Sequence, residues 1–366
     1  MILKQSPRLL TQVDKFDKMG ENNIKENLLV GLGNPLLDIS AVVNKQFLDK
    51  YELKENDAIL ADDRHRNLYE DITENYKVSY IAGGSVQNTL RVAQWLLGTP
   101  NVVTKFGCVG KDKYSKILHD KATESGVNVR YQYHESEPTG TCAVLITGQH
   151  RSLCAKLGSS GHFSVEHLRQ PENRKLLENA QFFYVSGYFL SANREAQIEA
   201  NKIALRNDRP FMLNLSAPIV CQIFAKDILE TLPYVDVLFG NESEAESISK
   251  SLNLGSKNVE EIALKLSELP KENKRRKRLV VITQGVDPVV YAFEGQVKSF
   301  PVVKLPEDKI VDTNGAGDAF VGGFLAQFIL NKSLDVCVKC GIWAASEIIQ
   351  RNGCSFEGKP NFNEAI

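Results

Sequence analysis

The sequence lacks the features that mark several large classes of protein. None of its apolar runs is long enough to cross a bilayer, and Lys4, Arg8, Asp14 and Lys15 interrupt residues 1–20, so we predict neither a membrane span nor a secretory signal. The 366 residues carry a formal net charge of −1, which provides no general attraction to nucleic acid or to an anionic membrane. We therefore expect a chain that binds neither.

Disulfide, zinc and Walker signatures are also missing. The seven cysteines have no framework spacing, which is typical of reduced thiols in the cytoplasm or nucleus. Cys337–Cys340 is a lone CxxC pair with no second Cys/His pair nearby, so no zinc site is predicted. Gly110–Asp112 has Asp where a Walker A motif needs Ser or Thr, and the protein-kinase signatures do not occur.

Charge is clustered at one place only, in the basic run Lys274–Arg278. The simplest interpretation is a solvated loop between a helix and a strand, and a nuclear-import signal is the alternative. We therefore predict a cytoplasmic protein and leave a nuclear location open. Residues 1–26 are predicted to be a polar, poorly ordered lead-in.

What the chain does contain is a regular alternation of short apolar strands with helices in its second half. The strands are predicted at Phe182–Ser186, Met212–Leu215, Val235–Phe239 and Leu279–Thr283, and one of the helices between them at Val220–Leu232. This pattern indicates a parallel sheet covered by helices on both faces, with ligands bound beyond the carboxyl ends of its strands. Polar residues that follow strands and would share this rim are Asn34, Asn214, Asn241, Glu244, Thr283 and Gly285.

The segment Asp312–Asp318 has the sequence DTNGAGD and leads directly into an apolar, helix-compatible run. Its two glycines free the backbone to point N–H groups inward, and a helix N-terminus attracts anions, so the segment predicts an anion site. Asp318 is then either an N-terminal cap or a catalytic base. Gly322-Gly323 within the helix indicates a close approach of backbone or ligand at that point.

Two segments nearer the N-terminus have similar features. Gly83-Gly84 stands before a helical pattern in which Asn88 lies one turn inside, and this arrangement fits either an ordinary turn or close backbone approach to a ligand. Asp38 is a lone carboxylate in an apolar run, for which a structural Asp in a turn is the alternative to a binding role.

Taken together, these segments resemble the ribokinase/PfkB family of kinases. Gly83-Gly84 with Asn88 and the segment 312–318 are similar to its two signatures. Four further segments resemble the members of that family that act on adenosine: residues 33–40, 138–142, 214–218 and 239–244. The resemblance runs in order from about Leu28 to about Pro360.

The resemblance implies an α/β, ribokinase-like fold, in which a mostly parallel central sheet has helices on both faces and a small β-sheet lid is added. The kinase domain would span residues 27–366, with lid segments near 36–60, 78–82 and 131–150. It also implies an ATP-dependent kinase that phosphorylates the 5′-hydroxyl of adenosine, and we expect a monomer.

The resemblance further implies roles for individual residues. Asp38 would accept both ribose hydroxyls, Tyr188 would stack on the purine, and Leu36 and Leu153 would be apolar walls. The remaining substrate-binding residues would be Asn34, Gly83, Gly84, Ser85, Asn88 and Asn214.

On the side of the phosphoryl donor, Asp318 would be the catalytic base and Arg151 would neutralise the transferring phosphate. The anion hole would come from Gly315, Ala316 and Gly317. Asn241 and Glu244 would hold Mg²⁺ through water, and the ATP side would be lined by Thr283, Gly285 and Asn314, with Asn241.

Two positions depart from the family pattern, and both concern the base. Ala58 stands where Gln is frequent, and Ile219 stands where an aromatic residue is frequent. A kinase of the same fold acting on another nucleoside or on a sugar is therefore an alternative, although Tyr188 and the apolar walls favour a base over a bare sugar. A non-catalytic nucleoside-binding protein is the third hypothesis, and it has no use for Asp318, Arg151 and Glu244 together.

Overall fold

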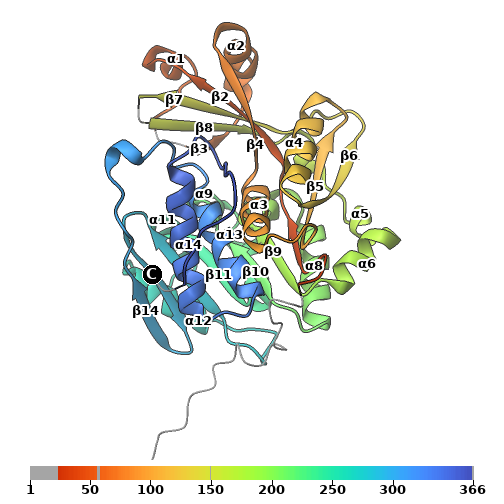
Figure 1. The fold of residues 1–366 in the computed structure, drawn as a ribbon, viewed down its shortest axis with the longest axis vertical. Coiled ribbons are helices and arrows are strands. Elements are labelled where there is room, and N and C mark those ends of the chain that lie inside the picture. Colours follow the sequence, from red (N-terminus) through yellow and green to blue (C-terminus); the bar gives the residue numbers. More distant parts are fainter. Residues whose placement is uncertain (1–23, 56–57, 149, 365–366) are drawn as a thin grey trace, which may run out of the picture.

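The computed structural model of the chain describes residues 24–55, 58–148 and 150–364. Most of the predicted lead-in, residues 1–23, therefore lies outside the described residues. Two sheets dominate the fold (Figure 1). The large sheet contains β1 (Leu29–Leu32), β5 (Val103–Gly110), β6 (Asn128–His134), β9 (Phe182–Ser186), β10 (Phe211–Asn214), β11 (Val237–Asn241), β12 (Leu279–Gln284), β13 (Asp287–Phe293) and β14 (Gln296–Phe300).

The strands of the large sheet lie in the order β14-β13-β12-β11-β10-β9-β1-β5-β6. All neighbours from β12 to β6 pair in parallel, and the antiparallel pairs are β12–β13 and β13–β14, at one edge. The α/β fold class predicted from the alternation of strands and helices is confirmed. Polar residues at the ends of β1, β9, β10, β11 and β12 consequently share one rim, as predicted.

Helices cover both faces of this sheet, because successive side chains of each strand point to opposite sides. Phe183 and Val185 of β9 pack into one cluster and Tyr184 into the other. The first face is covered by α5 (Val165–Arg169), α6 (Pro171–Asn179), α8 (Arg194–Arg206), α10 (Ala225–Thr231), α11 (Glu242–Ser251) and α12 (Val259–Glu268). The second is covered by α3 (Ser85–Leu97), α13 (Ala316–Ile329) and α14 (Leu334–Ile349).

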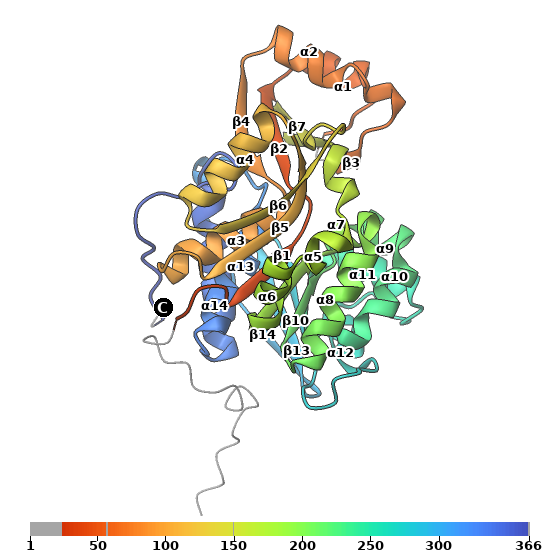
Figure 2. The ribbon, with the colours of Figure 1, turned by 90° about the vertical axis from the view of Figure 1, so that its right-hand side faces the viewer.

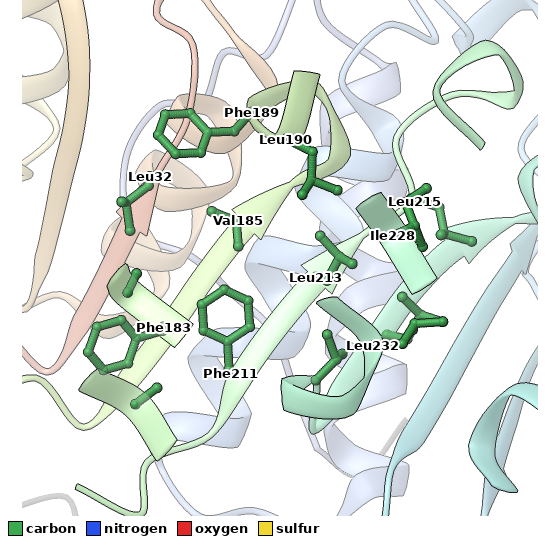
Figure 3. Packing of buried hydrophobic residues seen from close by; sticks show 14 of the residues in the cluster. Leu32, Phe183, Val185, Phe189, Leu190, Phe211, Leu213, Leu215, Ile228 and Leu232 are labelled. Atoms are coloured by element: carbon green, nitrogen blue, oxygen red, sulfur yellow. The ribbon is translucent and has the colours of Figure 1, made fainter. Parts of the chain in front are cut away.

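Figure 3 shows part of the first cluster, where phenylalanine and leucine side chains of the strands meet the surrounding helices. Two short helices, α7 (Gly187–Ala192) and α9 (Pro218–Ile223), follow the carboxyl ends of β9 and β10. They stand at the rim rather than under the sheet. No helix in the described part of the chain is both long enough and apolar enough to cross a membrane.

The small sheet contains β2 (Leu36–Val42), β3 (Ala58–Leu60), β4 (Val78–Gly83), β7 (Thr141–Thr147) and β8 (His150–Lys156), in the order β3-β8-β7-β2-β4. Its outer face packs on α1 (Lys45–Lys50) and α2 (Leu68–Asn75), at the top of Figures 1 and 2. Ile39 and Ala41 of β2 point to this apolar cluster, whereas Asp38 and Ser40 point to the opposite face. The alternation places Asp38 and Ser40 on the inner face, which is turned toward the large sheet.

A small cluster joins the two sheets at α4 (Lys113–Glu124). Leu118 of this helix packs with Leu37 and Ala82 of the small sheet and with Val109 and Tyr131 of the large one. Asp112 is the N-cap of α4, and its side chain accepts hydrogen bonds from the backbone N–H groups of residues 114 and 115. This cluster is the apolar contact around which the two sheets are placed.

The structure corrects three expectations. The segment near 131–150 was predicted to lie in the small sheet, but Tyr133 belongs to β6, which pairs with β5 in the large sheet. The helix predicted over 220–232 is divided into α9 and α10. The basic run 274–278 is not uniformly solvated: Arg278 is fully buried and donates five hydrogen bonds to backbone carbonyls, which end nearby helices.

Candidate active site

A cavity of about 630 Å³ lies between the inner face of the small sheet and the carboxyl ends of the large sheet's strands. Side chains from both sheets and from the segment before α13 line it. The predicted site residues that line it are Asn34, Leu36, Asp38, Gly84, Ser85, Asn88, Leu153, Tyr188, Asn214, Asn241, Glu244, Thr283, Gly285, Asn314, Gly315, Gly317 and Asp318. Three predicted residues do not line it: Gly83, Arg151 and Ala316.

Asp318 stands in the first turn of α13, which begins at Ala316 after Gly315 in the left-handed conformation (φ 79°). Its carboxylate does not cap its own helix. Ser85 Oγ donates to Oδ1 at 2.7 Å, and Asn88 Nδ2 donates to Oδ2 at 3.1 Å. Burial raises the pKa of Asp318 to about 6, and the two hydrogen bonds act in the opposite direction. The carboxylate is therefore fixed, ionised at neutral pH and basic enough to take a proton.

Residues 312–318 form the loop that leads into α13 together with the first residues of that helix. The Asp312 side chain fixes the shape of this loop. This buried carboxylate accepts from Asn314 N at 2.9 Å and, through its other oxygen, from Gly353 N at 3.0 Å. Asn314 Nδ2 is buried and has no hydrogen-bond partner among the described residues. A Cβ built on Gly317 would meet nothing within 4 Å, so this face of the loop is open to the cavity. An unpartnered donor at a helix N-terminus suits an anion.

Asp38 faces this loop from the small sheet. No described side chain or backbone group hydrogen-bonds its carboxylate, and burial followed by the charges of Asp318 and Asp312 raises its pKa to about 8. Gly83, on the neighbouring strand, explains how the carboxylate fits: a Cβ at this position would lie 2.5 Å from both Asp38 oxygens. Gly83 therefore makes room for Asp38 rather than lining the cavity itself. Two hydroxyl groups that donate to this carboxyl would favour its ionised form and lower the pKa again, so the site is suited to a vicinal diol.

Apolar side chains form the end of the cavity beside β3 and α9. Leu153 pairs with Ala58 in the β8–β3 ladder, and Ile219 stands half-exposed on α9. Tyr188 is held below them, because its Oη donates to Ser216 O at 3.0 Å and its own carbonyl accepts from Asn34 Nδ2 at 3.2 Å. This end offers flat, apolar surfaces of the kind that enclose an aromatic base.

Asn214 is used locally as well as lining the cavity. Its Oδ1 accepts from the backbone N–H of Ser216 at 3.0 Å, and Ser216 adopts a positive φ of 74°. Ser216 Oγ in turn accepts from Gly187 N at 2.9 Å, which ties the loop after β10 to the start of α7. The carboxyl ends of two neighbouring strands are therefore fixed before any ligand binds.

Asn241 and Glu244 form a reciprocal cap at the start of α11. Glu244 N donates to Asn241 Oδ1 at 2.8 Å, and Asn241 N and Nδ2 each donate to a Glu244 oxygen at 3.0 Å. Burial, and then the nearby charges of Glu242 and Asp318, raise the pKa of Glu244 to about 7. The described residues contain no cluster of three or more His, Cys, Asp or Glu able to hold a metal ion directly. The two residues thus present carboxylate and amide oxygens at the cavity wall without forming a complete metal cage.

Arg151 is placed differently from its predicted role. Its Nη2 donates to Val311 O at 2.9 Å, and its Nε lies 3.8 Å from Asp312 Oδ1. The side chain thus reaches from the small sheet to the backbone that enters the 312–318 segment, and it does not line the cavity. Ala316 lies in the first turn of α13, where its backbone rather than its side chain is available.

Several residues that line the cavity were not assigned to the site in the sequence analysis, among them Asp312, which shapes the loop, Gly353 and Cys354. Asp312 is the first residue of the segment Asp312–Asp318, so the sequence did mark its position, although not its role in the loop. No local pattern marks Gly353 and Cys354, because their contacts are with residues far apart in the sequence, such as Asp312 and Arg91.

Comparison with known proteins gives consistent matches over almost the whole chain. Residues 45–361 match the family described as pfkB family carbohydrate kinase. The chain is 48% identical to adenosine kinase 2 of Arabidopsis thaliana over 346 residues, which cover 94% of this chain and 100% of that protein.

Two solved structures extend this similarity to the fold. Adenosine kinase of Anopheles gambiae, in complex with P1,P4-di(adenosine-5) tetraphosphate, is 55% identical, with a TM-score of 0.89 over 92% of this chain and 100% of that one. Adenosine kinase of Schistosoma mansoni, in complex with 2-fluoroadenosine, is 35% identical, with a TM-score of 0.88 over 92% and 98% of the two chains.

Proposed function

Since this chain belongs to the adenosine kinases of the pfkB carbohydrate kinase family, we propose how its own residues carry out phosphoryl transfer. The enzyme transfers the terminal phosphoryl group of ATP to the 5′-hydroxyl of adenosine, which yields AMP and ADP. The observation that carries the assignment of roles is the Asp318 carboxylate, which Ser85 and Asn88 fix at the N-terminus of α13 inside the cavity.

We assign the base role to Asp318. The ionised carboxylate takes the proton of the 5′-hydroxyl as the oxygen attacks the terminal phosphorus, and the bond to the leaving ADP oxygen breaks. The transferring group gains its charge stabilisation from the N-terminus of α13, where the backbone of Gly315, Ala316 and Gly317 and the unpartnered Asn314 Nδ2 are available. These donors are in place before the reaction and need no reorganisation.

Nucleoside binding is assigned to the opposite wall. Asp38 accepts the two ribose hydroxyls, and the base lies between Leu153 with Leu36 on one side and Tyr188 on the other. Asn34 and Asn214 act by holding the Tyr188 segment, as their hydrogen bonds indicate. Ala58 and Ile219 add apolar surface at the same end and no polar contact for the edge of the base.

The residues near α11 fit a magnesium ion carried by the donor nucleotide. Asn241 and Glu244 supply hard oxygen atoms at the cavity wall, and the surplus of carboxylates around Glu244 favours a cation there. With no third or fourth protein ligand in the described residues, the contact would run through the ion's water molecules. When bound, Mg²⁺ neutralises charge on the phosphates of the donor. Thr283 and Gly285 line the cavity beside this position and are assigned to the donor nucleotide.

Two wider assignments follow the same evidence from the chain. We propose a monomer, because one chain supplies both walls of the cavity. We also propose a cytoplasmic location, because all seven cysteines are free and buried, as in a reducing compartment.

The test of this function is a comparison of ADP release with adenosine, inosine, guanosine and ribose as acceptors. Adenosine should give the highest kcat/KM, and ribose the lowest, because ribose engages Asp38 but not the apolar end of the cavity. A clear preference for ribose or another sugar would favour the alternative of a sugar kinase. Tight adenosine binding without any ADP release would point to a binding protein.

A further inference from the structure

Two sets of side chains on helix α3 hydrogen-bond to residues that line the cavity. The roles assigned above explain only the first set. At its start, Ser85 and Asn88 hold the Asp318 carboxylate. Arg91 follows Asn88 by three residues and therefore lies on the same side of the helix, one turn further on. It is buried, with 8% of its surface exposed.

The guanidinium of Arg91 contacts two other segments of the chain. Its Nη1 donates to the backbone carbonyl of Cys354 at 3.1 Å, its Nε donates to Ser125 Oγ at 3.0 Å, and its guanidinium lies 5.2 Å from the ring centre of Phe356. No carboxylate of the described residues forms an ion pair with it. A buried charge that binds a backbone carbonyl instead of a carboxylate is costly to place, so a specific use is expected.

The carbonyl that Arg91 binds belongs to a segment, residues 350–358, that we name the C-terminal strap. Gly353 N donates to Asp312 Oδ2 at 3.0 Å. The next residue packs against the turn that begins α13: a Cβ built on Gly315 would lie 3.1 Å from the Cβ of Cys354. Gly353 and Cys354 also line the cavity. The strap therefore supports the segment 312–318, which we call the anion loop.

The strap reaches the small sheet as well. A Cβ built on Gly353 would lie 3.1 Å from Ile81 of β4, and Gly353 itself has a positive φ of 62°. One point of the strap thus meets the anion loop, the cavity and a strand of the small sheet. Its position is fixed by the hydrogen bond from α3 to the next residue.

We propose that Arg91 is a positioning residue for phosphoryl transfer. By binding the Cys354 carbonyl, it keeps the strap pressed on Gly315 and Asp312, so that the loop N–H groups and Asp318 are set by the same helix, α3. The proposal rests on the function assigned above. It differs from a merely structural role because the strap has a second attachment, at Trp95, which does not touch the loop.

This second attachment provides a matched control. Trp95 Nε1 donates to Gly358 O at 2.8 Å, and its ring stacks on Phe356 at 5.0 Å between centres. Trp95→Phe removes the hydrogen bond and keeps most of the stacking. Ser125→Ala is a further control, because it removes the other partner of Arg91 and leaves the Cys354 contact unchanged.

The experiment compares Arg91→Met, Arg91→Lys, Trp95→Phe and Ser125→Ala with the wild-type enzyme, by Tm, by kcat and KM for adenosine and ATP, and by hydrogen exchange of the amides at 312–318. Arg91→Met should lower kcat by about 10- to 100-fold, the rate equivalent of one charge-assisted hydrogen bond, and leave the KM for adenosine nearly unchanged. Exchange at 312–318 should become faster. Arg91→Lys should recover part of the loss, since it keeps an N–H donor.

The two controls should lower Tm without changing kcat by more than about twofold. The proposal is overturned if Arg91→Met keeps wild-type kcat, or if Trp95→Phe loses as much kcat as Arg91→Met at the same loss of Tm. Should Arg91→Met fail to fold, the kcat of Arg91→Lys is compared with that of Ser125→Ala. A lower kcat in Arg91→Lys supports the proposal, and equal kcat values overturn it. If the wild-type enzyme releases no ADP with adenosine, the assigned function fails, and the hydrogen exchange of the loop in each variant still decides whether Arg91 positions it.

Discussion

Asp318 illustrates how neighbouring side chains adjust a single carboxylate. Burial raises its pKa to about 6, whereas the hydrogen bonds from Ser85 and Asn88 favour the ionised form and limit that rise. At neutral pH the group is ionised, as a base must be. It is also more basic than an exposed aspartate, which improves its ability to accept the 5′-hydroxyl proton.

We expect Asp318→Asn to lower turnover by about 10²–10⁴-fold, because a general base is lost, while adenosine binding stays nearly intact. The base works only when deprotonated, so the kcat/KM of the wild-type enzyme should fall as pH drops below about 6. Ser85→Ala removes a hydrogen bond that favours the ionised form, so its acid limb should move to higher pH. Steady-state kinetics across pH, with adenosine affinity measured separately, test both statements.

Two results would contradict this assignment. One is an Asp318→Asn enzyme that retains a tenth or more of wild-type turnover, since phosphoryl transfer would then not depend on a base at this position. The other is an acid limb that stays in place in Ser85→Ala, since the limb would then belong to a different group.

Individual residues could be predicted from the sequence where the signal was local. Asp38 and Asp318 stand in segments whose neighbours mark them, and both line the cavity. The support of Asp318 by Ser85 spans 233 positions, and no local pattern can show such a contact. Arg151 was expected at the transferring phosphate, and its hydrogen bond to Val311 O could not be predicted because it depends on how the two sheets are placed.

At the scale of elements, the pairing of β2 with β4 explains why β4 ends in a glycine, Gly83. Leu36 pairs with Gly83 and Asp38 with Ile81, so the Asp38 carboxylate projects over the Gly83 backbone. Gly83 does not have a positive φ, so its backbone conformation does not require glycine. Glycine is required at this position because a Cβ would collide with the Asp38 carboxylate. The strand pair thus makes room for the carboxylate to which we assign the ribose.

We therefore expect Gly83→Ala to weaken adenosine binding by displacing Asp38, with little change in kcat at saturating adenosine. Asp38→Ala should cost up to several kcal/mol of binding, since charge-assisted hydrogen bonds contribute about 1.5–3 kcal/mol each. If Gly83 acts only through Asp38, the double variant should bind adenosine no worse than Asp38→Ala alone. Calorimetry with adenosine and with 2′,3′-dideoxyadenosine measures this, and additive losses in the double variant would show that Gly83 has another role.

Helix packing accounts for a second glycine pair. A Cβ on Gly322 would lie 2.7 Å from Thr89 O of α3, and a Cβ on Gly323 would lie 2.6 Å from Cys340 O of α14. The close approach predicted for this pair is therefore an approach of backbones, and it brings α3 near enough for its side chains to reach Asp318. The basic run shows the opposite limit of sequence analysis, since only the tertiary structure reveals that Arg278 is buried and donates to backbone carbonyls of two segments, 232–235 and 266–270.

At the scale of the whole molecule, the two sheets meet at the small cluster around α4. Leu118 of α4 packs between them, and Arg151 links β8 to the backbone before α13. The walls of the cavity therefore belong to parts that can change their relative position without disturbing either core. Closing the small sheet over the site would exclude water, which competes with the 5′-hydroxyl for the phosphoryl group.

We expect adenosine to slow hydrogen exchange in β2, β3, β7 and β8 more than ATP alone does, because its ribose and base contact residues of these strands, whereas the donor contacts the large sheet. The measurement is hydrogen exchange by mass spectrometry on the free enzyme and on each binary complex, with α12 as an internal reference that should not change. Closure would also let Arg151 leave the Val311 carbonyl for the transferring phosphate, so Arg151→Met should lower kcat and leave this protection by adenosine in place. Equal exchange of the four strands in the free and adenosine-bound enzymes would mean that the small sheet is already closed. In that case Arg151 would keep the position it has here, and its substitution would affect the loop before α13 rather than the phosphate.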